Sequence, residues 1–188
     1  MNTNYVIAIA VAFLLVFGVV IGLVYYSRTR HSKQMQEHYG PEYDHVVETT
    51  GSAKAAEAEL KQRNKHVEGL NIRSLTTIEH DRYLVEWKEV QAKFVDDPSQ
   101  AIKDGDRLIM EVMQLRNYPV SDFEDRAADI SVAYPELVTN YRAAHAIALK
   151  NEQKTADTEE LRKAMVYDKA LFTELVVTEN PVEMEKVQ

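Results

Sequence analysis

Near the N-terminus, residues 5–26 form an unbroken stretch without a charge or a strongly polar side chain (YVIAIAVAFLLVFGVVIGLVYY). As an α-helix, this stretch would be about 33 Å long, enough to cross a hydrocarbon core of about 30 Å. Tyr5 stands at one end, and Tyr25 and Tyr26 stand at the other, where the two membrane–water interfaces would lie. The stretch therefore predicts a transmembrane helix over residues 5–26.

A cleaved signal peptide is the alternative interpretation of the same stretch. Signal peptides begin with a basic segment, continue with a shorter apolar run and end at small residues that form the cleavage site. Here no Lys or Arg precedes Arg28, and the run ends in tyrosines. We therefore expect an uncleaved anchor.

The basic residues next to the apolar stretch, Arg28, Arg30 and Lys33, all lie on its C-terminal side. Because loops that carry Lys and Arg stay in the cytoplasm, this side of the membrane helix is expected to be cytoplasmic. The sequence thus predicts a single-pass protein with its N-terminus outside, a juxtamembrane linker over residues 27–40 and the remaining chain in the cytoplasm.

Two glycines within the apolar stretch, Gly18 and Gly22, have the G-x-x-x-G spacing that lets two membrane helices approach closely. This spacing would support a homo-oligomer. Glycines are also common in membrane helices, so we favour a chance spacing as the explanation.

The charge balance of the rest of the chain is acidic. Residues 34–188 carry 19 basic and 30 acidic side chains, which leaves a net charge of −11. Such a domain repels phosphate backbones, and this argues against nucleic acid as a partner. The chain also contains no cysteine, which excludes disulfides, thiolate metal sites and cysteine nucleophiles.

Helix start signals recur along the rest of the chain. Thr76-Thr-Ile-Glu79 and Ser121-Asp-Phe-Glu124 have the pattern of a capping box, and Asp97-Pro98 places a cap before a proline at the first helical position. Apolar residues recur at intervals of three, four and seven, as in amphipathic helices. The predicted helices span residues 52–70, 76–95, 97–117, 121–130, 135–150 and 157–177.

The predicted fold class is therefore all-α. One N-terminal transmembrane helix is followed by an antiparallel helical bundle of about five to six helices, because long helices with short connections favour that arrangement. The soluble helical domain covers residues 41–177, and residues 178–188 are expected to be a disordered tail.

A search for catalytic or metal-binding patterns is negative. No H-E-x-x-H pair, glycine-rich phosphate loop or G-x-S-x-G turn occurs in the sequence. Polar residues gather around Gly40-Pro41 in EHYGPEYDH (residues 37–45), and we interpret them as a solvated turn in preference to a weak divalent-metal site. The sequence thus predicts no catalytic residue, no metal site and no cofactor.

His145 and Asp168 both fall within apolar stripes of their predicted helices, so we expect them to face the core. A buried carboxylate needs a partner, and a His145–Asp168 pair would supply one. We interpret this pair as a structural hydrogen bond between two helices. The alternative is a general base that an acid orients.

Four segments of the chain are similar to a family of uncharacterised bacterial single-pass membrane proteins. The segments are YGPEYDHVVE (39–48), VQAKFVDDP (90–98), VMQLRNYPVSDFEDRAADIS (112–131) and YRAAHAIA (141–148). The resemblance extends over residues 39–177. It implies a bacterial source, an N-terminal anchor and a helical domain, and it implies no catalytic residue.

Two functions are compatible with these features. The first is a membrane-anchored interaction or scaffold protein in the bacterial inner membrane, whose partners are the lipid bilayer and a protein. The alternative is a membrane-bound small-ligand sensor or enzyme with a site between helices near His145. We favour the first, because an anchor and a full-sized domain are present without a recognisable catalytic set.

Overall fold

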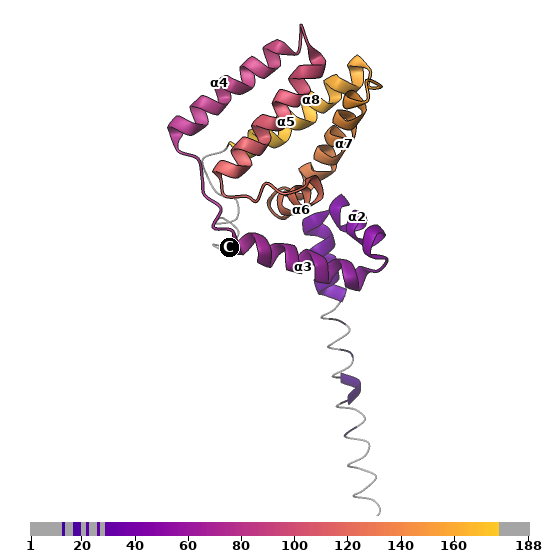
Figure 1. The fold of residues 1–188 in the computed structure, drawn as a ribbon. Helices are drawn as coiled ribbons and strands as arrows, with labels where there is room; N and C mark the ends of the chain where they lie inside the picture. Colours follow the sequence, from indigo (N-terminus) through magenta and orange to yellow (C-terminus); the bar gives the residue numbers. More distant parts are fainter. Residues whose placement is uncertain (1–12, 14–16, 20–21, 23–25, 27–28, 177–188) are drawn as a thin grey trace, which may run out of the picture. The chain divides into compact units, whose positions relative to one another are not determined.

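The computed structural model describes residues 13, 17–19, 22, 26 and 29–176. The chain divides into two compact units, Met1–His38 and Tyr39–Gln188. In the first unit, the described residues are helical. In the second, the described residues form seven helices joined by short connections, without a strand (Figure 1). The predicted all-α class and the helical bundle are therefore confirmed.

The predicted membrane anchor, residues 5–26, lies mostly outside the described residues. Within the part that the structure describes, no helix is both long enough and apolar enough to cross a membrane. Gly18 and Gly22 are described and helical, and a Cβ atom added to either would meet nothing within 4 Å. The anchor and the pairing of these glycines stay predictions.

The seven helices of the second unit include the six that were predicted and one more. The additional helix follows Gly40-Pro41, where the sequence suggested only a polar turn, and proline occupies its first turn. The bounds are α2 Pro41–Thr50, α3 Ala53–Gly69, α4 Thr77–Lys93, α5 Pro98–Leu115, α6 Phe123–Ala133, α7 Pro135–Glu152 and α8 Thr158–Leu175.

Most of the predicted helix starts are confirmed. The Thr76–Glu79 capping box opens α4, and the Asp97 carboxylate accepts a hydrogen bond from the Gln100 amide (2.9 Å) at the start of α5. The start of α6 differs by one residue. Its cap is Asp122, whose carboxylate accepts a hydrogen bond from the Asp125 amide (3.0 Å).

The core of the bundle centres on α8, which packs against both α5 and α7 (Figure 1). Trp87 of α4 stacks on Phe172 of α8, with ring centroids 4.5 Å apart. Gly105 of α5 lies at this contact, since a Cβ atom added there would be 3.7 Å from the Trp87 ring. Trp87 is thus a core residue.

Arg116, which is fully buried, joins the ends of several elements. Its guanidinium donates hydrogen bonds to the Leu175 carbonyl (3.0 Å), the Tyr134 hydroxyl (3.2 Å) and the Arg73 carbonyl (3.1 Å). Among the described residues it forms no ion pair. Because the C-terminal end of a helix carries partial negative charge, the last turn of α8 takes the place of a carboxylate.

Glu42 of α2 is the most deeply buried carboxylate in the described part of the chain, with 1% of its surface exposed. One oxygen accepts a hydrogen bond from Arg63 of α3 (2.7 Å), and the other accepts one from Arg142 of α7 (2.9 Å). These three residues are named the Glu42 clasp. The interpretation of residues 37–45 as a solvated turn is therefore wrong for Glu42, because a partner 100 positions away covers it.

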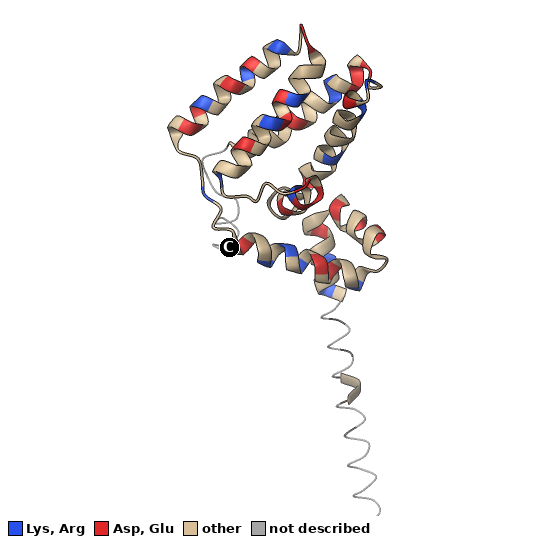
Figure 2. Cartoon of the chain, in the orientation of Figure 1, with Lys and Arg blue, Asp and Glu red and all other residues tan. Residues whose placement is uncertain are grey.

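The clasp fixes the α2–α3 hairpin against the rest of the bundle. Arg63 also contacts Glu59 and the Ser131 hydroxyl (3.3 Å) of α6, and Arg142 also lies 3.6 Å from Glu124. Elsewhere, acidic and basic residues are interspersed along α4 and α5 (Figure 2). Exposed pairs of that kind contribute little to stability. Removal of one partner from the buried clasp is costly by comparison, because it leaves buried charge uncompensated.

We expect Glu42→Gln to destabilise the protein by about 3 kcal/mol, because two largely buried guanidinium groups lose the buried carboxylate that they share. The measurement is the free energy of unfolding in urea. Glu48→Gln is the matched control, since Glu48 is exposed on the same helix, and it should change stability by less than about 0.5 kcal/mol. Equal effects of the two substitutions would show that the clasp is not a structural tie.

Candidate functional site

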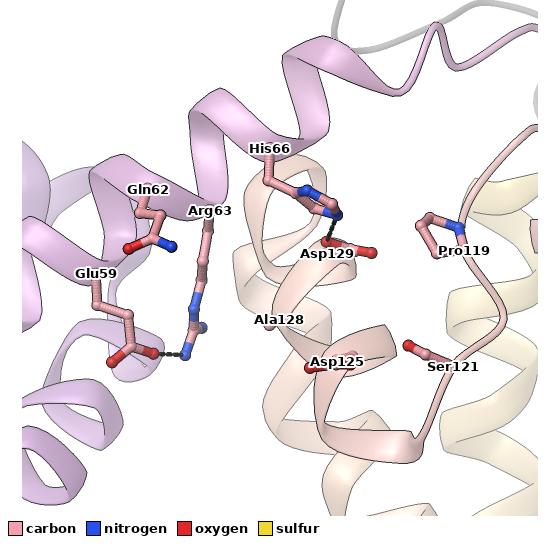
Figure 3. A pocket seen from close by; sticks show the side chains of 9 residues that line it. All are labelled: Glu59, Gln62, Arg63, His66, Pro119, Ser121, Asp125, Ala128 and Asp129. Carbon is pink, nitrogen blue, oxygen red and sulfur yellow. Dashed lines mark hydrogen bonds and ion pairs between the residues drawn. The ribbon is translucent and has the colours of Figure 1, made fainter.

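A pocket of about 470 Å³ lies between α3 and α6 (Figure 3). Its volume lies within the range of about 300–1,000 Å³ that is typical of sites for small ligands and side chains. One wall comes from α3, and the other comes from α6 and the loop before it. The lining residues are Glu59, Gln62, Arg63, His66, Pro119, Ser121, Asp125, Ala128 and Asp129.

A second pocket, of about 320 Å³, continues the first toward α2 and α7. The two pockets share Glu59, Arg63, Asp125 and Ala128, so they form one depression, which we name the α3/α6 groove. The Glu42 clasp lies behind it, because Arg63 belongs both to the clasp and to the groove wall. The position of the two walls therefore depends on the clasp.

The first pocket of the groove, between α3 and α6, is lined mainly by acidic side chains. Three carboxylates line this pocket, those of Glu59, Asp125 and Asp129, against the single guanidinium of Arg63. That guanidinium is already engaged by Glu42 and Glu59. The pocket is therefore suited to a cation and repels an anion.

Asp129 is the buried carboxylate of this pocket, with 7% of its side chain exposed. Its neighbour is His66, whose Nε2 atom lies 3.6 Å from one carboxylate oxygen. Within the described part of the chain, Asp129 accepts no hydrogen bond. Burial raises the pKa of Asp129 above its usual range; His66 and Arg63 oppose the shift, and Asp125 adds to it.

A third pocket, of about 340 Å³, lies between α4 and α5. Most of its charged side chains are already paired: Lys93 lies 2.6 Å from Asp104, and Arg107 lies 3.1 Å from Glu111 outside the lining. Glu86 lies 3.4 Å from Arg82, and the carboxylates of Glu86 and Asp104 are only partly buried or exposed. The third pocket therefore offers less for a charged ligand than the α3/α6 groove does.

The structure separates His145 from Asp168. The His145 ring stacks on Phe123 of α6, with ring centroids 3.6 Å apart and planes 6° from parallel. Among the described residues, no hydrogen bond or ion pair joins His145 to Asp168, so the expected pair is not formed. The sequence could place each residue on the inner side of its helix, but it could not show that Phe123 covers the face of His145.

Asp168 is nevertheless buried, as expected. Burial raises its pKa to about 8, and the neighbouring carboxylate of Asp106 on α5 adds to the shift. Burial also raises the pKa of Asp106, against the opposing effect of Arg126 and His145. In the part of the chain that the structure describes, no three His, Asp or Glu side chains are placed to hold a metal ion.

Sequence reasoning missed the residues of the α3/α6 groove. Arg63 and His66 are three positions apart on α3, and Asp125 and Asp129 are four apart on α6, so each pair shares one helix face. This spacing marks polar helix faces. It does not reveal that the two faces meet, because that depends on how the α2–α3 hairpin packs.

No family model, curated protein or solved structure matches the chain. The resemblance of residues 39–177 to a bacterial membrane-protein family therefore stays a prediction. The site has to be interpreted from its own geometry.

We expect Asp168→Asn to make stability less dependent on pH. Asp168 binds its proton more tightly in the folded protein, where its pKa is about 8, than at the usual value of 3.8. Its contribution to stability is therefore fully present below about pH 4 and is lost as the pH rises to about 8. Asparagine cannot ionise, so the variant should gain stability relative to the wild type across this range, by more than about 1.4 kcal/mol at pH 8.

Urea unfolding at intervals between pH 4 and pH 9 measures this difference. Asp96→Asn is the control, because Asp96 is exposed and its substitution should leave the pH profile unchanged. A constant difference between Asp168→Asn and the wild type at every pH would contradict the assignment.

Proposed function

We propose that the protein is a membrane-anchored helical module that binds a partner protein in the α3/α6 groove. The observation that carries this proposal is the groove itself, in which two adjoining pockets share a wall that the Glu42 clasp holds in place. A concave and charged surface of this kind is suited to recognition. The role is that of an interaction or scaffold protein.

The membrane part of the proposal rests on the sequence. The apolar stretch 5–26 serves as the anchor, and Arg28, Arg30 and Lys33 orient it. The helical domain then lies in the cytoplasm of a bacterial cell, at the inner membrane. There the net charge of −11 over residues 34–188 favours partners that carry a basic surface.

A ligand sensor or enzyme with a site near His145 has less support. The Phe123 ring covers one face of His145. None of the three pockets is lined by His145 or Asp168. The α3/α6 groove is the better candidate for binding.

The anchor and its orientation can be tested by cysteine labelling, since the chain has no cysteine of its own. Single cysteines are placed by Asn2→Cys and Thr178→Cys, and intact cells or spheroplasts are treated with an impermeant maleimide. We expect labelling at position 2 only. Labelling at position 178 only would place the domain on the outer side of the membrane, and recovery of the protein in the soluble fraction would contradict the anchor.

Binding in the groove can be tested by photo-crosslinking in cells. A photoreactive benzophenone amino acid replaces Gln62, which is exposed on the groove wall, or Ala92, which is exposed on α4 as a control. We expect a discrete adduct from position 62 alone. Ala128→Phe, which places a large ring at a residue that lines both pockets, should reduce that adduct at least tenfold.

Ala92→Phe is the matched control for the filling substitution and should leave the adduct at position 62 unchanged. The partner-binding proposal is contradicted if positions 62 and 92 give the same adducts, or if Ala128→Phe has no effect while the protein stays folded.

A further inference from the structure

We infer that the α3/α6 groove recognises a cationic side chain of the partner, the guanidinium of an arginine or the ammonium of a lysine, and that Asp129 is its counter-charge. This inference rests on the proposed function, because it names the chemistry that the partner presents. It assigns Asp129 as a binding residue.

The first argument is that the Asp129 carboxylate is buried without a hydrogen bond. The side chain is more than nine-tenths buried, and within the described residues nothing donates a hydrogen bond to it. Buried carboxylates in proteins are normally paired or hydrogen-bonded, because an uncompensated buried charge is costly. Figure 3 shows one oxygen of Asp129 facing His66 and the other facing the space in front of Pro119 and Ser121. The carboxylate is therefore directed into the pocket.

The second argument is that the neighbouring basic side chains hold Asp129 only weakly. Arg63 is held by Glu42 and Glu59, and among the described residues no hydrogen bond or ion pair joins it to Asp129. His66 is the remaining neighbour, and its Nε2 atom stays 3.6 Å away on a side chain that is 55% exposed. An exposed imidazole at this distance can turn toward solvent. A ligand cation can then take the position beside Asp129.

The third argument is the shape of the pocket around the carboxylate. Pro119 and Ala128 give an apolar wall along which the alkyl stem of a lysine or arginine can lie. Asp125, which is exposed, provides a second carboxylate at the pocket wall. A long alkyl stem that ends in a cation matches this combination, because its apolar part and its charge meet complementary surfaces at once.

The pKa of Asp129 is consistent with this assignment. Burial disfavours the ionised carboxylate and raises its pKa. A bound cation would stabilise the ionised form and lower the pKa again, so the binding of the cation and the ionisation of Asp129 favour one another.

The test uses the full chain, purified in detergent micelles, and two probes. One is arginine with an acetylated amino group and an amidated carboxyl group, and the other is the same derivative of citrulline, a neutral isostere of arginine. We expect the arginine probe to bind at least tenfold more tightly than the citrulline probe. The readout is the dissociation constant, obtained from NMR shifts of the groove residues.

Asp129→Asn should weaken binding of the arginine probe at least tenfold, because it replaces the counter-charge with a neutral group of the same shape. Asp96→Asn is the matched control. It removes a carboxylate at an exposed position that lines neither pocket of the groove, so binding should weaken less than threefold. Both variants are expected to fold, since neither removes an ion pair of the Glu42 clasp, and their melting temperatures verify this.

Three results would overturn the inference: equal binding of the two probes, undiminished binding by Asp129→Asn, or no binding of the arginine probe up to its solubility limit. A free small cation is the competing ligand. Agmatine, which is arginine without its carboxyl group, serves as the probe for such a ligand. If agmatine binds at least tenfold more tightly than the arginine probe, the groove is a site for a free small cation and not for a partner side chain.

The photo-crosslinking experiment distinguishes a failure of the proposed function from a failure of the cation inference. An adduct at position 62 that Ala128→Phe removes, but Asp129→Asn leaves intact, would keep the partner and reject the cation. An adduct that neither substitution changes would reject groove binding altogether.

Discussion

The Glu42 carboxylate, enclosed by two guanidinium groups, determines where the α2–α3 hairpin lies. Removing a carboxylate from water is costly, and the ion pairs with Arg63 and Arg142 offset this cost only when both are well placed. The geometry is therefore specific, because a shifted hairpin would leave a buried charge unpaired. The same ion pairs fix the position of the α3 wall of the α3/α6 groove, since Arg63 lines this groove.

Helix starts could be predicted from the sequence because capping is a local interaction. Thr76 and Glu79, or Asp157 and Glu160, bond each other across a single turn, and three or four residues suffice to reveal them. α2 escaped prediction because its start, at Gly40, has no side-chain cap, and its proline looked only like a break. Its polar first turn concealed a residue that tertiary contacts bury.

The candidate site escaped prediction for a related reason. The sequence shows that His145 and Asp168 lie on inner faces, and it shows equally well that Asp129 lies near apolar neighbours. What separates them is the neighbour that packing supplies: Phe123 for His145, Asp106 for Asp168, and an exposed His66 at the edge of an open pocket for Asp129. Glu42 and Asp129 are both buried acids near Arg63, but of the two only Glu42 accepts a hydrogen bond at each carboxylate oxygen. The difference between them is the reason to regard Asp129 as a binding residue.

Arg116 has a consequence for the order in which the domain can be completed during biosynthesis. Its acceptors include the Leu175 carbonyl, 59 residues further along the chain, and Trp87 likewise awaits Phe172. A nascent chain that lacks α8 would lack one acceptor of the Arg116 guanidinium and would leave the core open beside Trp87. The bundle can therefore close only when synthesis has passed its last helix, and until then its apolar faces are exposed to chaperones.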